Sequence, residues 1–348
     1  MKIVQNPYRD SGLSHAALSD VPMPSIQTQN PVNMLKRCPR AGITPLVRAQ
    51  ALAELCGVGE VIVKDERARM GLGSFKALGA AYVIACDHAA GVASGATYIT
   101  ASAGNHGMSV AAGAAAFGAR SIIYIAETVP QSFADRLVEE GGEVVREGRD
   151  YEASMRAASN AATDQKAVLL SDSSWPEYFE RPHRLMEGYL ALMAEVFTQM
   201  DEAPTHIFLQ AGVGGLAGAA AASARDHWGN DPLIVVVEPE AAPALIASIE
   251  SGGPVQTHGP ASAMGRLDCK EPSLIALKGL ARDADFFVTL SEDEGHAGAK
   301  TAAEFELPST PSGAAGLAAL VASAPHRTTL HLDDGSRVLL ILSEGPEA

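Results

Sequence analysis

Lys76 is the residue whose position in the sequence first suggests chemistry. It follows a short β-branched stretch at residues 61–64 and precedes an alanine-rich run at residues 77–85 that has a helical pattern. This order places the lysine in the first turn of a helix, where the helix dipole disfavours a positive charge. A lysine whose ammonium form is destabilised is more often the free amine, which condenses with an aldehyde. We therefore predict a nucleophilic Lys76, with a plain surface lysine as the alternative.

Two loops further along the chain have sequences suited to binding an anion. The first, Ser102-Ala103-Gly104-Asn105-His106-Gly107, joins an expected strand to an expected helix. The second, Gly212-Val213-Gly214-Gly215-Leu216, does the same after a strand at 206–210. Small residues let backbone amides close on a phosphate, and the helix N-terminus adds positive potential. The alternatives are an ordinary helix cap for the first loop and glycine used for packing in the second.

The second loop also fits a different class of enzyme. Gly212, Gly214 and Gly218, followed by Glu238 at the end of the next strand, resemble a dinucleotide-binding fingerprint with its ribose-binding acid. An NAD(P)-dependent oxidoreductase is therefore the remote alternative. Two points argue against this alternative. It leaves Lys76 and the 102–107 loop without a role, and such fingerprints usually lie at the start of a nucleotide-binding domain.

Taken together, these motifs resemble the fold-type II pyridoxal-phosphate enzymes, the threonine and serine dehydratases and their relatives. Within that superfamily the chain is most similar to the diaminopropionate ammonia-lyases. The similarity runs from about residue 42 to the end of the chain, with its segments in the family's order. The matching segments are residues 63–66, 71–72, 73–76, 102–107, 209–216, 237–239, 312–316 and 343–345.

The resemblance implies a set of cofactor-binding residues. Lys76 becomes the Schiff-base lysine for pyridoxal 5'-phosphate, and the residues Gly212 to Leu216 become the phosphate seat. Asn105 is implied to bond the phenolic oxygen, Ser343 to face the pyridine nitrogen, and Phe75 to pack near the ring. A hydroxyl at Ser343 does not hold that nitrogen protonated, which suits elimination better than transamination. A strand-end serine and a core phenylalanine are the plain alternatives for Ser343 and Phe75.

The resemblance also implies where the amino-acid substrate binds. Loop amides around Ser102, Gly104, Asn105 and His106 are expected to hold its carboxylate, and support of the loop is the alternative role for His106. Asp172 lies in a segment, Asp-x-x-Trp-x-x-Tyr, that the ammonia-lyases share. A carboxylate there can pair with the substrate's distal ammonium or accept a proton, which makes Asp172 a catalytic candidate beside Lys76. A helix N-cap is the alternative for Asp172.

Two positions depart from the diaminopropionate ammonia-lyase pattern. Ala103 stands where those enzymes carry an aspartate, and alanine cannot transfer a proton, which weakens the case for turnover of the D-isomer. Arg266, with Asp268 and Lys270, replaces small residues in a loop that resembles the family's M-A-G-L-A-C-G-E-P segment. If Arg266 faces the pocket it can pair with a second substrate carboxylate or a bulkier polar tail; otherwise it is a solvated surface charge.

The pattern along the chain predicts an α/β fold in which short apolar strands alternate with helices, as in parallel sheets covered on both faces. The resemblance implies two parallel-sheet lobes, as in the tryptophan synthase β chain, with the cofactor between them. The large lobe is expected at 1–84 plus 167–348 and the small inserted lobe at 85–166. Residues 1–41 are expected to form an extended arm, or else a disordered tail. Strands are expected at 61–64, 96–100, 121–125, 143–146, 167–171, 206–210, 233–238, 286–290 and 338–342, and helices at 49–56, 77–85, 105–117, 131–140, 151–163, 186–200, 215–225, 242–249, 292–305 and 313–324.

Bulk composition limits the possible partners. The 348 residues include 26 Lys and Arg against 41 Asp and Glu, a net charge of −15, which argues against nucleic acid or an anionic membrane surface. The four cysteines are widely spaced and form no metal-binding or disulfide pattern, so reduced thiols and a cytoplasmic location are expected. No apolar run is long enough to span a bilayer. The resemblance adds a homodimer to these expectations.

The prediction from sequence is a pyridoxal-phosphate-dependent carbon–nitrogen lyase that catalyses α,β-elimination on a β-substituted amino acid. L-2,3-diaminopropionate, giving pyruvate and ammonia, is the best candidate substrate. A hydroxy-amino-acid dehydratase acting on serine, threonine or 3-hydroxyaspartate is the alternative, favoured if Arg266 faces the pocket. A binding protein without catalysis is the third class.

Overall fold

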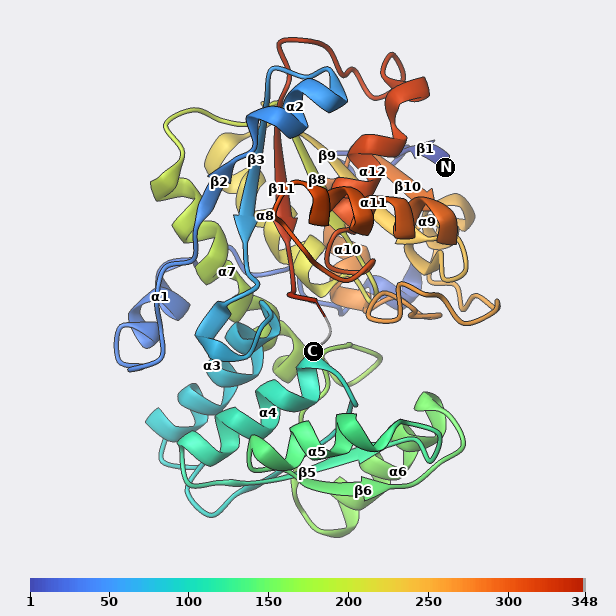
Figure 1. Cartoon of the computed structure of the whole chain (residues 1–348). Helices are drawn as coiled ribbons and strands as arrows, with labels where there is room; N and C mark the ends of the chain where they lie inside the picture. Colours follow the sequence, from blue (N-terminus) through green and yellow to red (C-terminus); the bar gives the residue numbers. More distant parts are fainter. Residues whose placement is uncertain (347–348) are drawn as a thin grey trace.

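The computed structural model describes residues 1–346, and its strands form two separate sheets (Figure 1). The strands are β1 (Lys2–Gln5), β2 (Leu46–Arg48), β3 (Glu60–Asp65), β4 (Thr97–Ala101), β5 (Arg120–Ile125), β6 (Glu143–Arg146), β7 (Val168–Leu169), β8 (His206–Gln210), β9 (Leu233–Pro239), β10 (Phe286–Leu290) and β11 (Arg337–Leu342). The larger sheet has the order β1-β10-β9-β8-β11-β3-β2, and the smaller one β6-β5-β4-β7. Pairing is parallel throughout except at the two edge strands β1 and β2.

Helices cover both sheets. They are α1 (Gln29–Leu35), α2 (Gln50–Cys56), α3 (Lys76–Ala89), α4 (Asn105–Ala116), α5 (Gln131–Glu139), α6 (Tyr151–Asp164), α7 (Glu180–Gln199), α8 (Gly215–Trp228), α9 (Ala244–Ser251), α10 (Leu274–Asp283), α11 (Glu292–Glu304) and α12 (Ala315–Ala322). Every residue of β8 and of β10 is buried, as strands covered on both faces require. The predicted α/β fold with parallel sheets is confirmed. Within residues 1–346, no helix combines the length and the apolar character that a membrane span needs.

The two sheets occupy different parts of the molecule. Figure 1 shows the four-stranded sheet with α4, α5 and α6 gathered below the seven-stranded sheet, and the chain after β11 running down between them. Strands β4 to β7 all come from residues 97–169, and the remaining strands come from either side of that range. The division into lobes at 85–166 stays a prediction. Strand β7 lies just beyond residue 166, the C-terminal end of that predicted lobe, and it pairs with β4, so it belongs to the smaller sheet.

Close packing of α3 against α7 sets the position of Lys76. A Cβ atom at Gly79 would lie 2.6 Å from the Tyr189 ring, and one at Gly188 would lie 2.7 Å from the Leu78 carbonyl oxygen. Both distances are too short for a side chain, so glycine at these positions lets the two helices touch. Tyr189 on α7 is thereby brought beside the start of α3, where Lys76 is the first helical residue.

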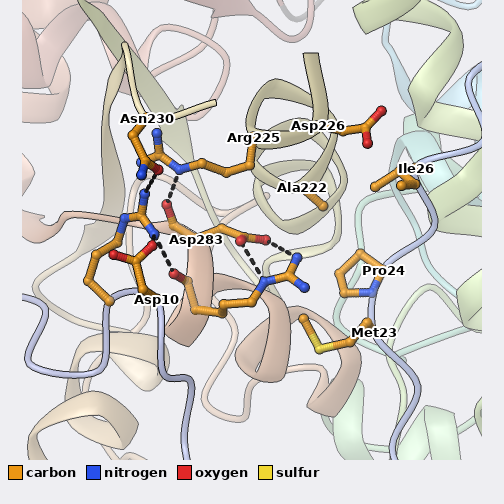
Figure 2. Close-up of a pocket in the computed structure, with 11 residues that line it drawn as sticks. Asp10, Met23, Pro24, Ile26, Ala222, Arg225, Asp226, Asn230 and Asp283 are labelled. Atoms are coloured by element: carbon orange, nitrogen blue, oxygen red, sulfur yellow. Dashed lines mark hydrogen bonds and ion pairs between the residues drawn. The ribbon is translucent and has the colours of Figure 1, made fainter. Parts of the chain in front are cut away.

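The N-terminal segment is part of the structure rather than a disordered tail. Its first residues form β1, which pairs antiparallel with β10 at the edge of the larger sheet. A hollow of about 410 Å³ separates the rest of the segment from α8 and α10 (Figure 2). Its arginines donate within the chain: Arg9 to Asn230, Arg225 to the Asp283 carbonyl, and Arg282 to the Asp283 carboxylate. The Arg9 bond ties the segment to residue 230, and the other bonds engage the arginines of α8 and α10, which leaves the hollow poorly suited to an anionic ligand.

Glu238, the acid of the alternative dinucleotide fingerprint, has a structural role. It is fully buried, and its carboxylate accepts the backbone N–H groups of Leu245 and Ile246 at 2.7 and 2.8 Å in the first turn of α9. Burial raises the pKa of Glu238 from about 4.5 to about 8, even though those two bonds favour the charged form. The carboxyl group is thus committed to capping a helix.

This buried carboxyl group makes the stability of the protein depend on pH. Its pKa is higher in the folded than in the unfolded chain, so the contribution of Glu238 to stability falls as pH rises from about 4.5 to about 8. Glu238→Gln removes this dependence. We expect wild type to lose about 1 kcal/mol per pH unit relative to the variant across that range. Urea unfolding at several pH values checks this, and a difference between the two proteins that stays constant with pH would contradict it.

Candidate active site

The residues singled out in the sequence come together around one cavity. The cavity, of about 360 Å³, lies at the carboxyl ends of β4, β8 and β11, where the loops after parallel strands converge. All of the predicted cofactor- and substrate-binding residues line it: Phe75, Lys76, Ser102, Gly104, Asn105, His106, Asp172, Gly212, Val213, Gly214, Gly215, Leu216, Arg266 and Ser343. Their shared location does not test their individual roles, which stay predictions.

Lys76 and Asp172 form an ion pair at this cavity. The Nζ atom of Lys76, at the start of α3, lies 2.5 Å from Oδ2 of Asp172, which follows β7. The side chains are 21% and 18% exposed, so the pair is largely buried but open to the cavity. The lysine also lies near two aromatic rings, 5.3 Å from the centre of Phe75 and 5.9 Å from that of Tyr189.

The expectation that Lys76 has a lowered pKa is wrong for this arrangement. Burial does lower the pKa of Lys76, but the Asp172 carboxylate, helped by Tyr189, outweighs it, and the pKa lies well above the ordinary value. Likewise, burial raises the pKa of Asp172, but the charge of Lys76 outweighs burial, and the pKa lies well below its usual range. The first-turn position of Lys76 is as expected. A carboxylate 96 residues away in the sequence decides its charge.

The glycine turn after β8 leaves room at the N-terminus of α8. Gly214 caps the helix with φ +95°, in the left-handed region that favours glycine, and no side chain caps the free amides of the first turn. A Cβ atom at Gly212 would lie 3.0 Å from the Cys269 Sγ and 3.1 Å from the Arg266 carbonyl oxygen. The turn thus exposes a row of backbone N–H groups, and residues larger than glycine would disturb it.

The loop after β4 is the second loop whose backbone is suited to binding an anion. Gly104 is the extended N-cap of α4, again without a side chain capping the helix. A Cβ atom at Gly107 would lie 2.1 Å from the Ser102 carbonyl oxygen, so only glycine permits this tight a turn. His106 is 5% exposed, and its Nε2 bonds the Leu170 carbonyl oxygen at 2.9 Å, which holds the loop against β7. Burial lowers the pKa of His106, so the ring is neutral.

Glu344 is the main residue of the site that the sequence analysis did not identify. Its buried carboxylate accepts a hydrogen bond from the Asn105 side-chain amide and another from the Thr310 hydroxyl. The Arg266 Nε lies 3.6 Å from the same carboxylate. Glu344 therefore joins the α4 loop of the smaller sheet to the end of β11. The sequence feature that could have identified Glu344 is its position directly after Ser343, inside a segment that already matches the family pattern.

Tyr151, Gln210 and Cys269 also line the cavity without having been predicted. Tyr151 begins α6 and is 51% exposed, so it covers part of the opening from the side of the smaller sheet. The Gln210 side chain donates to the carbonyl oxygens of Gly313 and Ile341, and it fixes the end of β8 beside β11. Tyrosine, glutamine and cysteine are common in ordinary helices and strands, so nothing in their local sequence marked them.

A comparison with protein families matches residues 38–344 to the family described as pyridoxal-phosphate dependent enzyme. The chain belongs to this family. It is 30% identical to the diaminopropionate ammonia-lyase of Salmonella typhimurium, over 89% of this chain and 87% of the relative. It is also 30% identical to the enzyme of that name from Escherichia coli K12, over 87% and 84% of the two chains.

Solved structures agree with this membership. The structure of Escherichia coli diaminopropionate ammonia-lyase in complex with an aminoacrylate–pyridoxal phosphate azomethine intermediate matches with a TM-score of 0.89 at 27% identity. The match covers 99% of this chain and 93% of that chain. Threonine deaminase isoform 2 from Solanum lycopersicum, at 20% identity, shares the fold with a TM-score of 0.81. The fold-type II architecture predicted from the sequence is therefore confirmed.

Pyridoxal phosphate is the cofactor of this pyridoxal-phosphate dependent enzyme, and the residues present fit it. The amides at the start of α8 suit the phosphate. The Tyr189 hydroxyl is buried without a hydrogen-bond partner among residues 1–346, next to Lys76 and the glycine turn, and so offers a further donor to a bound group. Lys76 suits the aldehyde. The oxidoreductase alternative is wrong, because family membership assigns another cofactor and Glu238 caps α9.

Proposed function

We propose that the protein is an ammonia-lyase that converts L-2,3-diaminopropionate and water to pyruvate and two molecules of ammonia. The observation that carries the proposal is the Lys76–Asp172 pair at the cavity, in a chain 30% identical to diaminopropionate ammonia-lyases over 89% of its length. An elimination of this kind needs a base at Cα and a group that handles the charge of the leaving amine. Lys76 and Asp172 supply these two functions side by side.

The reaction divides between the cofactor and the chain. Bound pyridoxal phosphate supplies an electron sink for negative charge at Cα. The Lys76 amine, freed when the substrate amine takes its place, removes the proton from Cα. As a double bond forms between Cα and Cβ, the bond from Cβ to nitrogen breaks, and its electron pair leaves with the amine. The distal group is bound as an ammonium and so departs as ammonia without a further proton; the 2-aminoacrylate product then hydrolyses to pyruvate and the second ammonia.

Asp172 has two tasks in this proposal. Its carboxylate pairs with the distal ammonium of the substrate and thereby orients the leaving group toward Lys76. It also lies within hydrogen-bond distance of the Lys76 Nζ atom, so its charge stabilises the ammonium that Lys76 becomes after it takes the α-proton. The α4 loop holds the substrate carboxylate with first-turn amides of α4 that the N-cap residue Gly104 leaves uncapped. Asn105 and Ser343 would hold the phenolic oxygen and the pyridine nitrogen of the cofactor, and Phe75 would pack beside its ring.

A hydroxy-amino-acid dehydratase remains the second candidate because Arg266 lines the cavity. A cation at this place suits a substrate with an additional carboxylate, such as 3-hydroxyaspartate. Relatives named probable D-serine dehydratase are 27% identical over 49% of the chain, a weaker and shorter match than that to the ammonia-lyases. The observations therefore favour diaminopropionate.

The lining of the cavity predicts a preference for the L-enantiomer. Ala103 lies in the cavity wall where an aspartate would stand in the family pattern, and its methyl group cannot accept a proton. The two enantiomers present their α-protons to opposite faces of the cofactor, and a proton acceptor is expected on the Lys76 face alone. We expect pyruvate release from L-diaminopropionate to be at least about 100-fold faster than from D-diaminopropionate, the usual contribution of one positioned acid or base.

This experiment also tests the proposed function. Pyruvate or the corresponding 2-oxo acid is measured from L- and D-diaminopropionate, serine, threonine and 3-hydroxyaspartate at equal concentrations. L-diaminopropionate should give the highest kcat/KM. Faster turnover of 3-hydroxyaspartate would replace the proposal with the dehydratase, and equal rates for the two enantiomers would contradict the role given to Ala103.

We also propose a homodimer in the cytoplasm. A groove of about 600 Å³ lies between α1, α3 and α4, and its apolar lining includes Met34, Leu35 and Phe117. Exposed basic residues at Arg37 and Arg40 lie in the same groove as the acidic pair Glu139–Glu140, so a two-fold arrangement can match opposite charges. The four cysteines are free thiols, which suits a reducing compartment.

A further inference from the structure

Tyr178 bonds the backbone on both sides of Leu170, directly before Asp172. Its hydroxyl donates to the Leu169 carbonyl oxygen at 2.9 Å and accepts the Ser171 N–H at 3.0 Å. Strand β7 lies at the edge of the smaller sheet, with β4 on its inner side. The outer edge of such a strand presents backbone groups that need partners. The Tyr178 hydroxyl supplies one donor and one acceptor at this edge, as a further strand would.

A tight turn brings Tyr178 back to the strand. The Tyr178 N–H donates to the Trp175 carbonyl oxygen at 2.9 Å. Between them lie Pro176 and Glu177, and Glu177 has φ +69°, as the third residue of a type II turn requires. The rings of Trp175 and Tyr178 stack with their centres 4.3 Å apart and their planes 16° from parallel, which fixes the phenol ring. Burial raises the pKa of Tyr178 to about 12, so the hydroxyl keeps the proton that it donates to Leu169.

Two buried serines fix the chain on the other side of Asp172. The hydroxyl oxygens of Ser174 and Ser273, the N-cap residue of α10, lie 2.7 Å apart. The Ser174 hydroxyl also accepts the Ile275 N–H at 2.9 Å, and its carbonyl oxygen accepts the Leu274 N–H at 3.1 Å. The two serines are 2% and 0% exposed. Asp172 thus lies between an attachment to the edge of β7 and an attachment to the start of α10.

We propose that Tyr178 is a positioning residue that holds the Asp172 carboxylate where it meets the Lys76 amine and the distal ammonium of the substrate, a proposal that rests on the function proposed above. The Asp172 Oδ2 lies 2.5 Å from the Lys76 Nζ. A side chain on a loop keeps so close a contact when the backbone on both sides of it is fixed. Tyr178 lies outside the cavity lining, so it acts through the backbone at Ser171. The Asp-x-x-Trp-x-x-Tyr segment then works as a unit, in which the two rings position the carboxylate.

A double-mutant cycle tests this coupling. Tyr178→Phe keeps the ring and its stack on Trp175 and removes only the hydroxyl. The cycle measures kcat/KM for wild type, Tyr178→Phe, Asp172→Asn and the double variant, on the substrate that the wild type turns over best. We expect Tyr178→Phe to lower kcat/KM by about 10-fold alone, and by less than about 2-fold once Asp172 is asparagine. If that substrate is L-diaminopropionate, Tyr178→Phe should cost less than about 3-fold with serine, whose leaving group does not pair with Asp172.

Hydrogen exchange of the holoenzyme adds a readout that does not depend on turnover. The Ser171 amide should exchange at least about 10-fold faster in Tyr178→Phe than in wild type, because it loses its acceptor. Tyr124→Phe, on β5 and outside the cavity lining, is the matched control and should change neither exchange at Ser171 nor kcat/KM.

Three outcomes would overturn the positioning role of Tyr178. They are unchanged exchange at Ser171, losses in the cycle that simply add, and equal losses with serine and diaminopropionate. A wild type that prefers another substrate would contradict the lyase assignment instead. The cycle is then run on that substrate, so the positioning role and the proposed function can fail separately.

Discussion

Lys76→Ala abolishes turnover of L-diaminopropionate. The Nζ atom of Lys76 is the nitrogen at the cavity that can both link to the aldehyde and, when displaced, reach the α-proton of a substrate. Removing it takes away the covalent link and the base together, so we expect kcat to fall by at least about 1,000-fold. Pyruvate release under saturating substrate measures the loss. The absorbance of the bound cofactor should also revert to that of the free aldehyde.

A control and a rescue make this result specific. Lys300→Ala removes an exposed lysine from α11 and should keep full activity, which excludes a general effect of lost charge. Circular dichroism should show that Lys76→Ala retains the helices of the wild type. A small amine such as methylamine should restore part of the activity by taking the place of the missing side chain. Retention of more than about a tenth of wild-type kcat would contradict the role of Lys76 as the base.

Asp172→Asn should separate the ammonia-lyase from a plain dehydratase. Asparagine is nearly the same size as aspartate but cannot pair with an ammonium as an anion or transfer a proton at neutral pH. We expect kcat/KM for L-diaminopropionate to fall by about 100-fold, with a loss of less than about 10-fold for serine, whose leaving group carries no charge. Cofactor absorbance at 1:1 loading should be unchanged. Steady-state rates for the two substrates provide the comparison.

A matched control completes the comparison. In the chain without cofactor, burial raises the pKa of Asp172, and the charge of Lys76 outweighs burial and holds that pKa well below its usual range. Asp164→Asn, an exposed substitution at the end of α6, serves as control. An equal loss for serine and diaminopropionate would mean that Asp172 supports the site without meeting the leaving amine.

Much of the site could be predicted from local sequence because each of its loops follows the carboxyl end of a strand in a parallel sheet. The 102–107, 212–216 and 343–345 segments each follow an apolar strand, and the carboxyl ends of parallel strands meet at one edge. Strand order was not needed to place them at one cavity. Lys76 could be assigned to the first turn of α3 because the preceding strand and the following alanine-rich run are both unambiguous.

The features that escaped prediction depend on contacts between distant parts of the chain. The pKa of Lys76 is set by Asp172, which no pattern around Lys76 reveals. Glu344 acquires its role from Asn105, 239 residues away in sequence. The sequence did not decide whether Arg266 faces the pocket or the solvent, because its loop has no hydrophobic periodicity. The edge strands β1 and β2 were missed because each has only 3 or 4 residues, too few to show alternation.

Reduction of the holoenzyme with borohydride, followed by proteolysis and mass spectrometry, tests the central assignment most directly. Borohydride makes the bond between an amine and the cofactor aldehyde permanent, so the labelled peptide identifies the amine. We expect one cofactor per chain, attached to Lys76 in the peptide that contains Gly73 to Lys76. A label on another lysine, such as Lys64 or Lys270, or recovery of the unmodified Lys76 peptide in full, would contradict the account.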